Sequence, residues 1–340
     1  MTILKKSLTV ASLLFAVNSL QAVELEAINV TTTSLGQETN IDDVQASIEV
    51  FDDTFIKKTN AQTVPQLLDN ALGVDVKNAG STSSISLRGF NSSHTLLLID
   101  GMRRTGKYGS FDLTSVQLSD IERIEIVRGP MSALYGADGI AGVINIITKK
   151  NSVKDSLKAS LITGMAQNHE RNSYIAKIYG NKKTDNISHN YGIEIRKKED
   201  FRENKTEIAT DLKNESRIFL SYGNSIKLNE SNTLNTRLEY SKQNDDGKNY
   251  ANVTTYEKEN RYQLTTQYNY IGEEFIFDSN LAYGYSDTDV NRGSGSETTD
   301  YKQLELNNYF RHYTSDNSTN IIGAGYKNDK IDVSMYTKKA

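Results

Sequence analysis

The chain has 340 residues, enough for two domains, with a formal net charge of −4 and 37% apolar residues. This balance gives no global basic field, so nucleic acid is not an expected partner. Cysteine is absent, which excludes disulfide frameworks, thiolate zinc sites and cysteine nucleophiles.

The first 22 residues have the pattern of a secretory signal peptide. Lys5 and Lys6 precede an apolar run over residues 8–17, and Gln21-Ala22 offers a cleavage site. An amphipathic N-terminal helix is the alternative. No later apolar run approaches the roughly 20 residues that a membrane helix needs. The exported product is therefore expected to be periplasmic, secreted or an outer-membrane barrel.

The next two segments differ in composition. Residues 23–40 are polar and threonine-rich, which predicts an extended linker. Residues 41–150 have the pattern of a compact α+β domain, with one helix capped by Thr63 and stopped by Gly73. Alternating or continuous apolar segments predict its strands at residues 47–51, 74–76, 85–87, 96–99, 121–127 and 143–147.

Residues 151–340 contain about nine short stretches in which apolar and polar residues alternate, separated by polar loops. An apolar face opposite a polar face, with tyrosines near the segment ends, is typical of outer-membrane barrel strands. A soluble β-sandwich is the alternative. The predicted strands contain residues 157–161, 174–178, 191–195, 218–222, 234–240, 262–270, 275–283, 304–306 and 322–326.

Three motifs connect the chain to a known family. Residues 121–149 read IERIEIVRGPMSALYGADGIAGVINIITK, and they follow Ile85-Ser-Leu-Arg-Gly89 and Leu97-Leu-Ile-Asp-Gly101. In this order and spacing, the motifs resemble the plug domain of TonB-dependent outer-membrane receptors. The resemblance implies a plug over residues 41–150, followed by antiparallel transmembrane β-barrel strands in the outer membrane of a Gram-negative bacterium. Such receptors are transporters, so no enzymatic activity is expected.

The resemblance also implies two sets of plug residues with roles. Arg88 and Arg128 each precede a glycine at a strand end, and they resemble a lock that pairs with carboxylates of the barrel wall; pairing within the plug is the alternative. The threonine-rich segment before the plug resembles a TonB box, a short strand that pairs with TonB. An ordinary N-terminal arm is the alternative. The TonB-binding residues would be Glu26, Ala27, Ile28, Asn29, Val30, Thr31 and Thr32.

A basic loop follows the predicted Asp100-Gly101 turn. Arg103, Arg104 and Lys107 lie beside Tyr108, and cations with an aromatic ring suit an anionic aromatic ligand such as a ferric catecholate siderophore. A solvated basic loop is the alternative. The motifs most resemble those of catecholate-siderophore and colicin receptors, but vitamin B12 and haem receptors of the family remain alternatives.

Other functional classes lack their sequence features. The four histidines are scattered, and neither a metalloprotease HExxH, a Gly-x-Ser-x-Gly elbow nor a Walker loop occurs. No cofactor or metal is therefore expected. A passive porin would lack both plug and TonB box, whereas an exported adhesion module would be soluble without detergent. The expected partners are TonB, a ferric siderophore or other iron complex, and outer-membrane lipid.

The length predicts an incomplete barrel. A plugged receptor needs about 22 strands, and roughly ten residues per strand plus loops require over 400 residues. Far fewer residues follow the predicted plug, so this chain is expected to be a fragment or a truncated product that cannot transport alone. The short segment before the predicted TonB box also argues against an extra signalling domain.

Overall fold

The computed structural model describes residues 29–30, 39–40, 47–79, 82–90, 92–106, 111, 113–129, 139–150, 155–165, 171–202, 208–315 and 318–337. Two units carry most of these residues. The plug unit is the part described between residues 47 and 150, and the wall is a nine-stranded sheet. None of the helices in the described ranges is long and apolar enough to cross a membrane.

The plug unit is built around a five-stranded mixed sheet. Its strands follow the order β3-β8-β9-β6-β7, and only β6 and β9 are parallel. A separate hairpin pairs β4 with β5. The bounds are β3 (Ser47–Asp52), β4 (Val74–Ala79), β5 (Thr82–Leu87), β6 (Thr95–Ile99), β7 (Met102–Arg103), β8 (Ile121–Arg128) and β9 (Gly142–Thr148). Each predicted plug strand lies in one of them.

Short helices cover this sheet, and one is shorter than the sequence predicts. The Thr63 hydroxyl caps α3 by accepting from the Gln66 amide at 3.3 Å, as expected. However, α3 ends at Leu68 because the Asn70 side chain donates to the carbonyls of Gln66 and Leu67, and Leu72 is 76% exposed. The helices are α2 (Asp53–Lys58), α3 (Val64–Leu68), η2 (Ser92–His94), η4 (Leu113–Ser115) and η5 (Leu118–Asp120).

The apolar core of the plug unit lies between its sheet and α3. Leu67 and Leu68 pack there with Ile124 and Ile146, and all four are fully buried. At the start of β9, a Cβ on Gly142 would lie 2.3 Å from the Val127 carbonyl oxygen, so only glycine fits. This close approach allows β8 and β9 to pair in the middle of the sheet.

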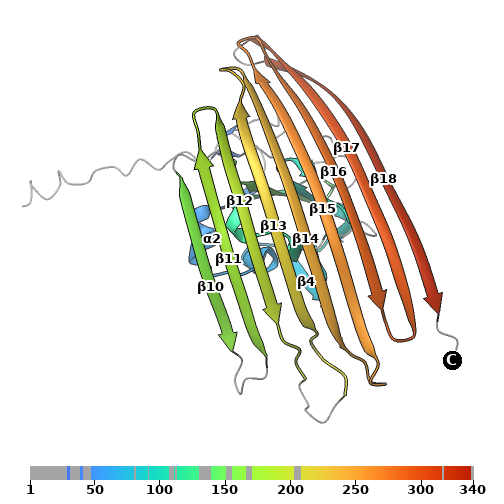
Figure 1. Ribbon diagram of the computed structural model, residues 1–340. Helices are drawn as coiled ribbons and strands as arrows, with labels where there is room; N and C mark the ends of the chain where they lie inside the picture. Colours follow the sequence, from blue (N-terminus) through green and yellow to red (C-terminus); the bar gives the residue numbers. More distant parts are fainter. Residues whose placement is uncertain are drawn as a thin grey trace, which may run out of the picture.

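The wall is a single curved antiparallel sheet whose strands follow chain order from β10 to β18. Figure 1 shows it wrapping along one side of the plug unit, whose elements are coloured blue to green. Each of the nine predicted segments lies in one strand. The bounds are β10 (Ser156–Met165), β11 (Asn172–Lys183), β12 (Ile187–Lys198), β13 (Asn214–Lys227), β14 (Asn232–Lys248), β15 (Thr254–Ile271), β16 (Phe275–Asn291), β17 (Gly295–Ser315) and β18 (Ser318–Thr337).

The two faces of the wall differ in polarity. On β12, Glu194 and Arg196 are buried on the plug side, while Ile193 and Ile195 are exposed on the other. This period-two alternation places polar groups inside and apolar groups outside, as a membrane barrel requires and as the sequence predicts. A second sheet that would make a sandwich does not occur in the described part of the chain.

Candidate functional site: the plug–wall interface

A chain of alternating charges crosses from the plug unit to β14. The buried Arg104 donates through Nη2 to Glu239 Oε2 and to Thr265 Oγ1, both at 3.2 Å. Arg237 Nε lies 3.0 Å from Glu239 Oε1, and its Nη2 lies 2.7 Å from Asp120 Oδ2. Each unit therefore contributes one cation and one anion to the same buried network.

Local structure positions these four charges. Arg237 and Glu239 are two residues apart on β14, so their side chains share the face toward the plug unit. Asp120 ends η5 just before β8, and its carboxylate also accepts from the Ser221 hydroxyl of β13. Burial lowers the pKa of Arg104 below its ordinary value while Glu239 opposes that shift, and an arginine remains charged at pH 7.

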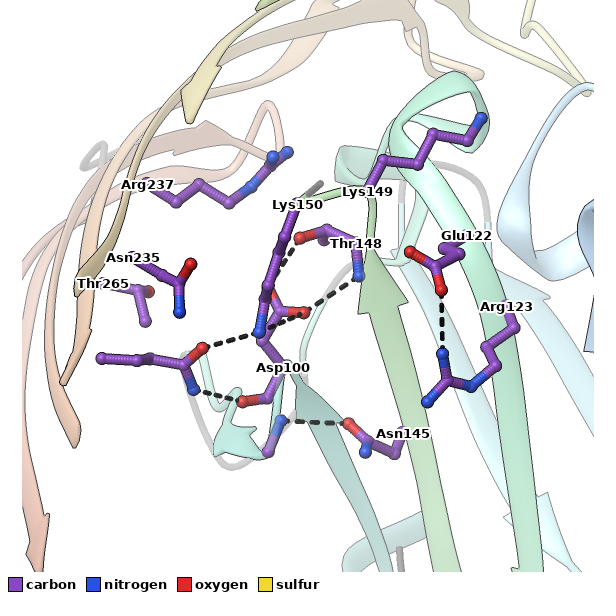
Figure 2. Close-up of polar contacts among 12 residues, drawn as sticks. Asp100, Glu122, Arg123, Asn145, Thr148, Lys149, Lys150, Asn235, Arg237 and Thr265 are labelled. Atoms are coloured by element: carbon purple, nitrogen blue, oxygen red, sulfur yellow. Dashed lines mark hydrogen bonds and ion pairs between the residues drawn. The ribbon is translucent and has the colours of Figure 1, made fainter. Parts of the chain in front are cut away.

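A second contact is centred on the predicted Asp100-Gly101 turn. Figure 2 shows the Asp100 carboxylate accepting from the amide and the hydroxyl of Thr148, at 2.9 and 2.7 Å. Lys150 Nζ lies 3.5 Å from the same carboxylate and donates to Gln267 Oε1 of the wall at 2.7 Å. Gln267 in turn donates to the Asp100 carbonyl at 2.7 Å. The turn, with φ of +53° at Asp100, is thus fixed against β15.

The Asp100 carboxyl gives a pH-dependent prediction. Burial raises its pKa, but the Lys150 charge and the Thr148 hydrogen bonds outweigh this and hold the pKa below its ordinary value of about 3.9. A depressed folded-state pKa stabilises the fold above the unfolded pKa, and that stability is lost as pH falls through the folded pKa. Asp100→Asn should therefore lower the free energy of unfolding by about 1–3 kcal/mol at pH 7.

Urea unfolding at pH 7 and at pH 3 checks this expectation. The difference between Asp100→Asn and the unsubstituted protein should shrink at the lower pH, because pH 3 lies below the ordinary pKa and the carboxyl of the unfolded chain is then mostly protonated. Asp75→Asn is the matched control, because Asp75 is exposed on β4 and its ion-pair distance to Lys77 is 3.9 Å. An equal loss at both pH values would contradict the electrostatic explanation.

Further polar contacts between the plug unit and the wall are spread over several wall strands. Arg261 of β15 donates to the Ser115 hydroxyl at 3.3 Å, and its guanidinium lies 4.5 Å from the centre of the Phe111 ring. The interface is therefore not confined to one strand. The other contacts are Arg196 Nη2 to Gln62 O, Asn190 Nδ2 to the carbonyls of Lys149 and Lys150, Thr105 Oγ1 to Tyr301 Oη, and Gln303 Nε2 to Arg103 O.

The two arginines of the predicted lock, Arg88 and Arg128, make their described contacts within the plug unit. Arg128 pairs with Glu49 on the neighbouring strand β3 and donates to the Leu72 carbonyl at 2.9 Å, which is the within-plug alternative. The Arg128 side chain can reach Glu49 because Ser47 stands opposite Arg128 in the sheet, and Glu49 lies two residues further along β3 on the same face. Arg88 is exposed with φ of +52°, and its amide donates to the Gly73 carbonyl. The described interface uses Arg104 and Asp120.

The predicted ligand loop is only partly described. Arg103 and Arg104 line a cavity of about 460 Å³ between the plug unit and the last two wall strands, together with Tyr301 and Lys327. Arg104 is paired with Glu239, so its charge is already engaged by the wall. Lys107 and Tyr108 lie outside the described residues.

The predicted TonB-binding segment is also only partly described. Asn29 and Val30 form β1, which pairs antiparallel with β2 (Thr39–Asn40). The other predicted TonB-binding residues lie outside the described ranges: Glu26, Ala27, Ile28, Thr31 and Thr32. No group of three or more acidic or histidine side chains able to hold a metal ion occurs in the part of the chain that the structure describes.

Sequence reasoning missed the wall residues of the interface. The available signal was opposite charges two residues apart within a predicted strand, as in Glu194/Arg196, Arg237/Glu239 and Glu259/Arg261. Such pairs on the inner face of a barrel strand indicate an interior that contacts another polar surface. The sequence alone does not say which plug residue each one meets.

Comparisons with known proteins agree with this architecture. Residues 40–143 match the family described as TonB-dependent Receptor Plug Domain. The vitamin B12 transporter BtuB of Vibrio vulnificus is 33% identical over 179 residues, covering 52% of this chain and 30% of that protein. An iron-regulated outer membrane virulence protein of Vibrio cholerae is 38% identical over 144 residues, covering 40% and 22%.

The fold also matches a solved receptor. A variant of the ferric enterobactin receptor PfeA from Pseudomonas aeruginosa has 19% identity, with a TM-score of 0.71 over 85% of this chain and 50% of that one. This chain thus spans about half the length of the solved receptor. The comparisons confirm the predicted resemblance to TonB-dependent receptors and the predicted fold class of a plug followed by antiparallel barrel strands.

Proposed function

We propose that this chain forms part of a TonB-dependent receptor in the outer membrane of a Gram-negative bacterium, which imports a ferric siderophore. The observation that carries this proposal is the plug unit seated on the polar face of the wall by buried charges, as in the Asp120–Arg237 pair. A plug held in this way closes a lumen. Passage of a ligand then requires work to move the plug, which a passive porin does not need.

Energy would reach the plug through TonB, the expected partner. The segment Glu26–Thr32 precedes the plug unit and has the β-prone residues that pairing with a partner strand needs. Tension on that segment would act on the plug unit, whose contacts with the wall are polar and can be replaced by water. An exported adhesion module transports nothing, so it would not need a plug that can be displaced from its wall.

A catecholate siderophore suits the cavity beside the basic loop. Arg103, Tyr301 and Lys327 provide two cations and one aromatic ring around about 460 Å³. Anionic, aromatic iron complexes are recognised through charge-assisted hydrogen bonds and contacts between cations and rings. The relative from Vibrio cholerae is iron-regulated, which agrees with import of an iron complex, and the ferric enterobactin receptor shares the fold.

The binding test combines Arg103→Gln with Lys107→Gln in the full receptor. Each charge-assisted contact is worth roughly 1.5–3 kcal/mol when partly desolvated. We therefore expect affinity for a ferric catecholate to fall by well over tenfold, with a larger loss at low salt. Arg104 stays unchanged, because its loss would also break the contact with Glu239.

Equilibrium binding to outer membranes that contain each receptor variant measures this effect. Lys182→Gln is the control, because Lys182 is an exposed cation of β11, six strands away from β17 in the order of the wall. A change in affinity of less than twofold for the double variant would mean that the loop is only solvated surface. Loss of uptake in a strain without TonB, with binding intact, separately tests the transport assignment.

Vitamin B12 is the second candidate ligand. The observation that favours it is the similarity to the vitamin B12 transporter BtuB over 179 residues. Binding of a corrinoid would not depend on cationic side chains, whereas binding of a triply anionic ferric catecholate would. Competition between cyanocobalamin and a ferric catecholate for the same receptor therefore separates the two candidates.

A further inference from the structure

The basic loop of the plug unit is held by the wall at three successive residues. The Arg103 carbonyl oxygen lies 3.5 Å from Gln303 Nε2, and the Arg104 guanidinium is paired with β14. The hydroxyl oxygens of Thr105 and Tyr301 are 2.7 Å apart. Two of these three contacts come from β17, where Tyr301 and Gln303 are two residues apart and share the face toward the plug unit. The third residue of the loop is therefore held through a pair of hydroxyl groups.

The contact between Thr105 and Tyr301 borders the proposed ligand cavity. Both residues line the cavity of about 460 Å³, together with Arg104 and Lys327. Tyr301 is only 9% exposed, so its hydroxyl is largely removed from bulk water and needs hydrogen-bond partners inside the protein. A change in this hydroxyl pair would thus alter the boundary of the space that a ligand enters.

A carboxylate of the neighbouring strand sets the direction of this contact. Asp329 of β18 stands opposite Gln303, which makes it a diagonal neighbour of Tyr301 on the same face of the wall. The Asp329 carboxylate interacts with the Tyr301 hydroxyl, and its Oδ2 lies 2.8 Å from Lys327 Nζ. An ionised carboxylate can only accept a hydrogen bond, and a phenol has one proton to donate. The Tyr301 proton therefore points to Asp329, and the Thr105 hydroxyl is the donor to Tyr301 Oη.

This polarity leaves a lone pair of the Tyr301 oxygen directed at the plug unit. The oxygen accepts from Thr105 while its own proton stays with Asp329, so both interactions can persist together. The position of the basic loop is thereby set before a ligand arrives. A loop that is already ordered loses little conformational entropy on binding. The Tyr301 hydroxyl can therefore strengthen ligand binding without touching the ligand.

We propose that Tyr301 is a positioning residue for ligand capture, whose hydroxyl receives Thr105 and holds the basic loop at the edge of the cavity. This inference rests on the proposed siderophore function and deepens it. The aromatic ring of Tyr301 remains available to the ligand, whereas the hydroxyl acts on the ligand only through the loop. Asp329 contributes by keeping the Tyr301 proton away from Thr105.

The first test measures binding of the ferric complex of a synthetic hexadentate catecholate. The protein is the natural polypeptide that carries these strands, purified from outer membranes in mild detergent. Tyr301→Phe keeps the ring and removes the hydroxyl, and Thr105→Val keeps the shape and removes the donor. A neutral hydrogen bond of this kind corresponds to about a fivefold effect, so each variant should bind about fivefold more weakly. Thr105→Ser keeps the hydroxyl and should lose much less.

The double variant separates positioning from direct contact with the ligand. If the Tyr301 hydroxyl acts through Thr105, combining Tyr301→Phe with Thr105→Val should weaken binding by about fivefold, as each change does alone. Independent effects would multiply to about 25-fold, and that result would overturn the positioning role. Tyr283→Phe is the matched control, because Tyr283 lies on the apolar face of the wall, opposite Leu264 and Leu304. Its affinity should not change.

Hydrogen exchange of the ligand-free protein gives a readout that does not depend on the ligand. Amides in peptides covering residues 102–106 should exchange faster in Tyr301→Phe and in Thr105→Val, and at the normal rate in Tyr283→Phe. Loop exchange that does not rise, or affinity within twofold in both single variants, would overturn the positioning role while siderophore binding by the unsubstituted receptor stands. Failure of the unsubstituted receptor to bind the ferric complex would instead overturn the proposed function and with it the role in ligand capture.

Discussion

Replacing Arg237 by methionine is expected to lower the free energy of unfolding by about 3–5 kcal/mol, because it leaves a buried carboxylate without its cation. Asp120 is almost fully buried, and Arg237 is its only partner of opposite charge within 4 Å in the described chain. The Ser221 hydroxyl would remain as a hydrogen-bond donor but does not neutralise the charge. Glu239 would lose one of its two arginines at the same time.

Urea-dependent unfolding in detergent, followed by tyrosine fluorescence, measures this loss, since the chain has no tryptophan. Lys77→Met is the matched control: Lys77 and its partner Asp75 are both mostly exposed, so its loss should cost about 0–1 kcal/mol. Adding Asp120→Asn to Arg237→Met should recover part of the stability, because the unpaired charge is then removed. Equal effects of Arg237→Met and Lys77→Met would contradict the idea that this network anchors the plug unit.

The same network shows why sequence reasoning found the fold more readily than the site. Alternation of apolar and polar residues is local, so each wall strand, such as β12, could be recognised from its own residues. Contacts between the units are not local. Arg104 and Glu239 are 135 positions apart, and Asp120 and Arg237 are 117 apart. Periodicity indicates which face a side chain takes but not which residue it meets.

Competition for hydrogen bonds explains why α3 is shorter than the sequence predicts. The apolar residues after Pro65 predict a helix that continues to Gly73, yet the Asn70 side chain binds the carbonyls that the next turn would need. Arg128 is a similar case, because the family resemblance left two partners open and the chain supplies Glu49 on the adjacent strand. Both outcomes depend on side-chain geometry over a few ångströms, which no residue pattern encodes.

Replacing Ile28 by proline should abolish uptake of the ferric siderophore while binding at the cell surface persists. Proline has no amide hydrogen and fixes φ, so the segment could no longer pair along its length with a strand of TonB. Ile28 immediately precedes β1, which pairs with β2 over only two residues. So short a pairing offers little competition to a longer partner strand, which supports this region as the point where TonB attaches.

Uptake and binding of a radiolabelled ferric catecholate, measured in the same cells, separate the two effects. Ile28→Val is the matched control, because valine keeps the amide hydrogen and the preference for extended structure. We expect the proline variant to match a strain without TonB, and the valine variant to transport normally. Uptake that survives the proline substitution would mean that TonB binds elsewhere. Loss of binding together with uptake would point instead to a defect in folding or export, which outer-membrane fractionation would reveal.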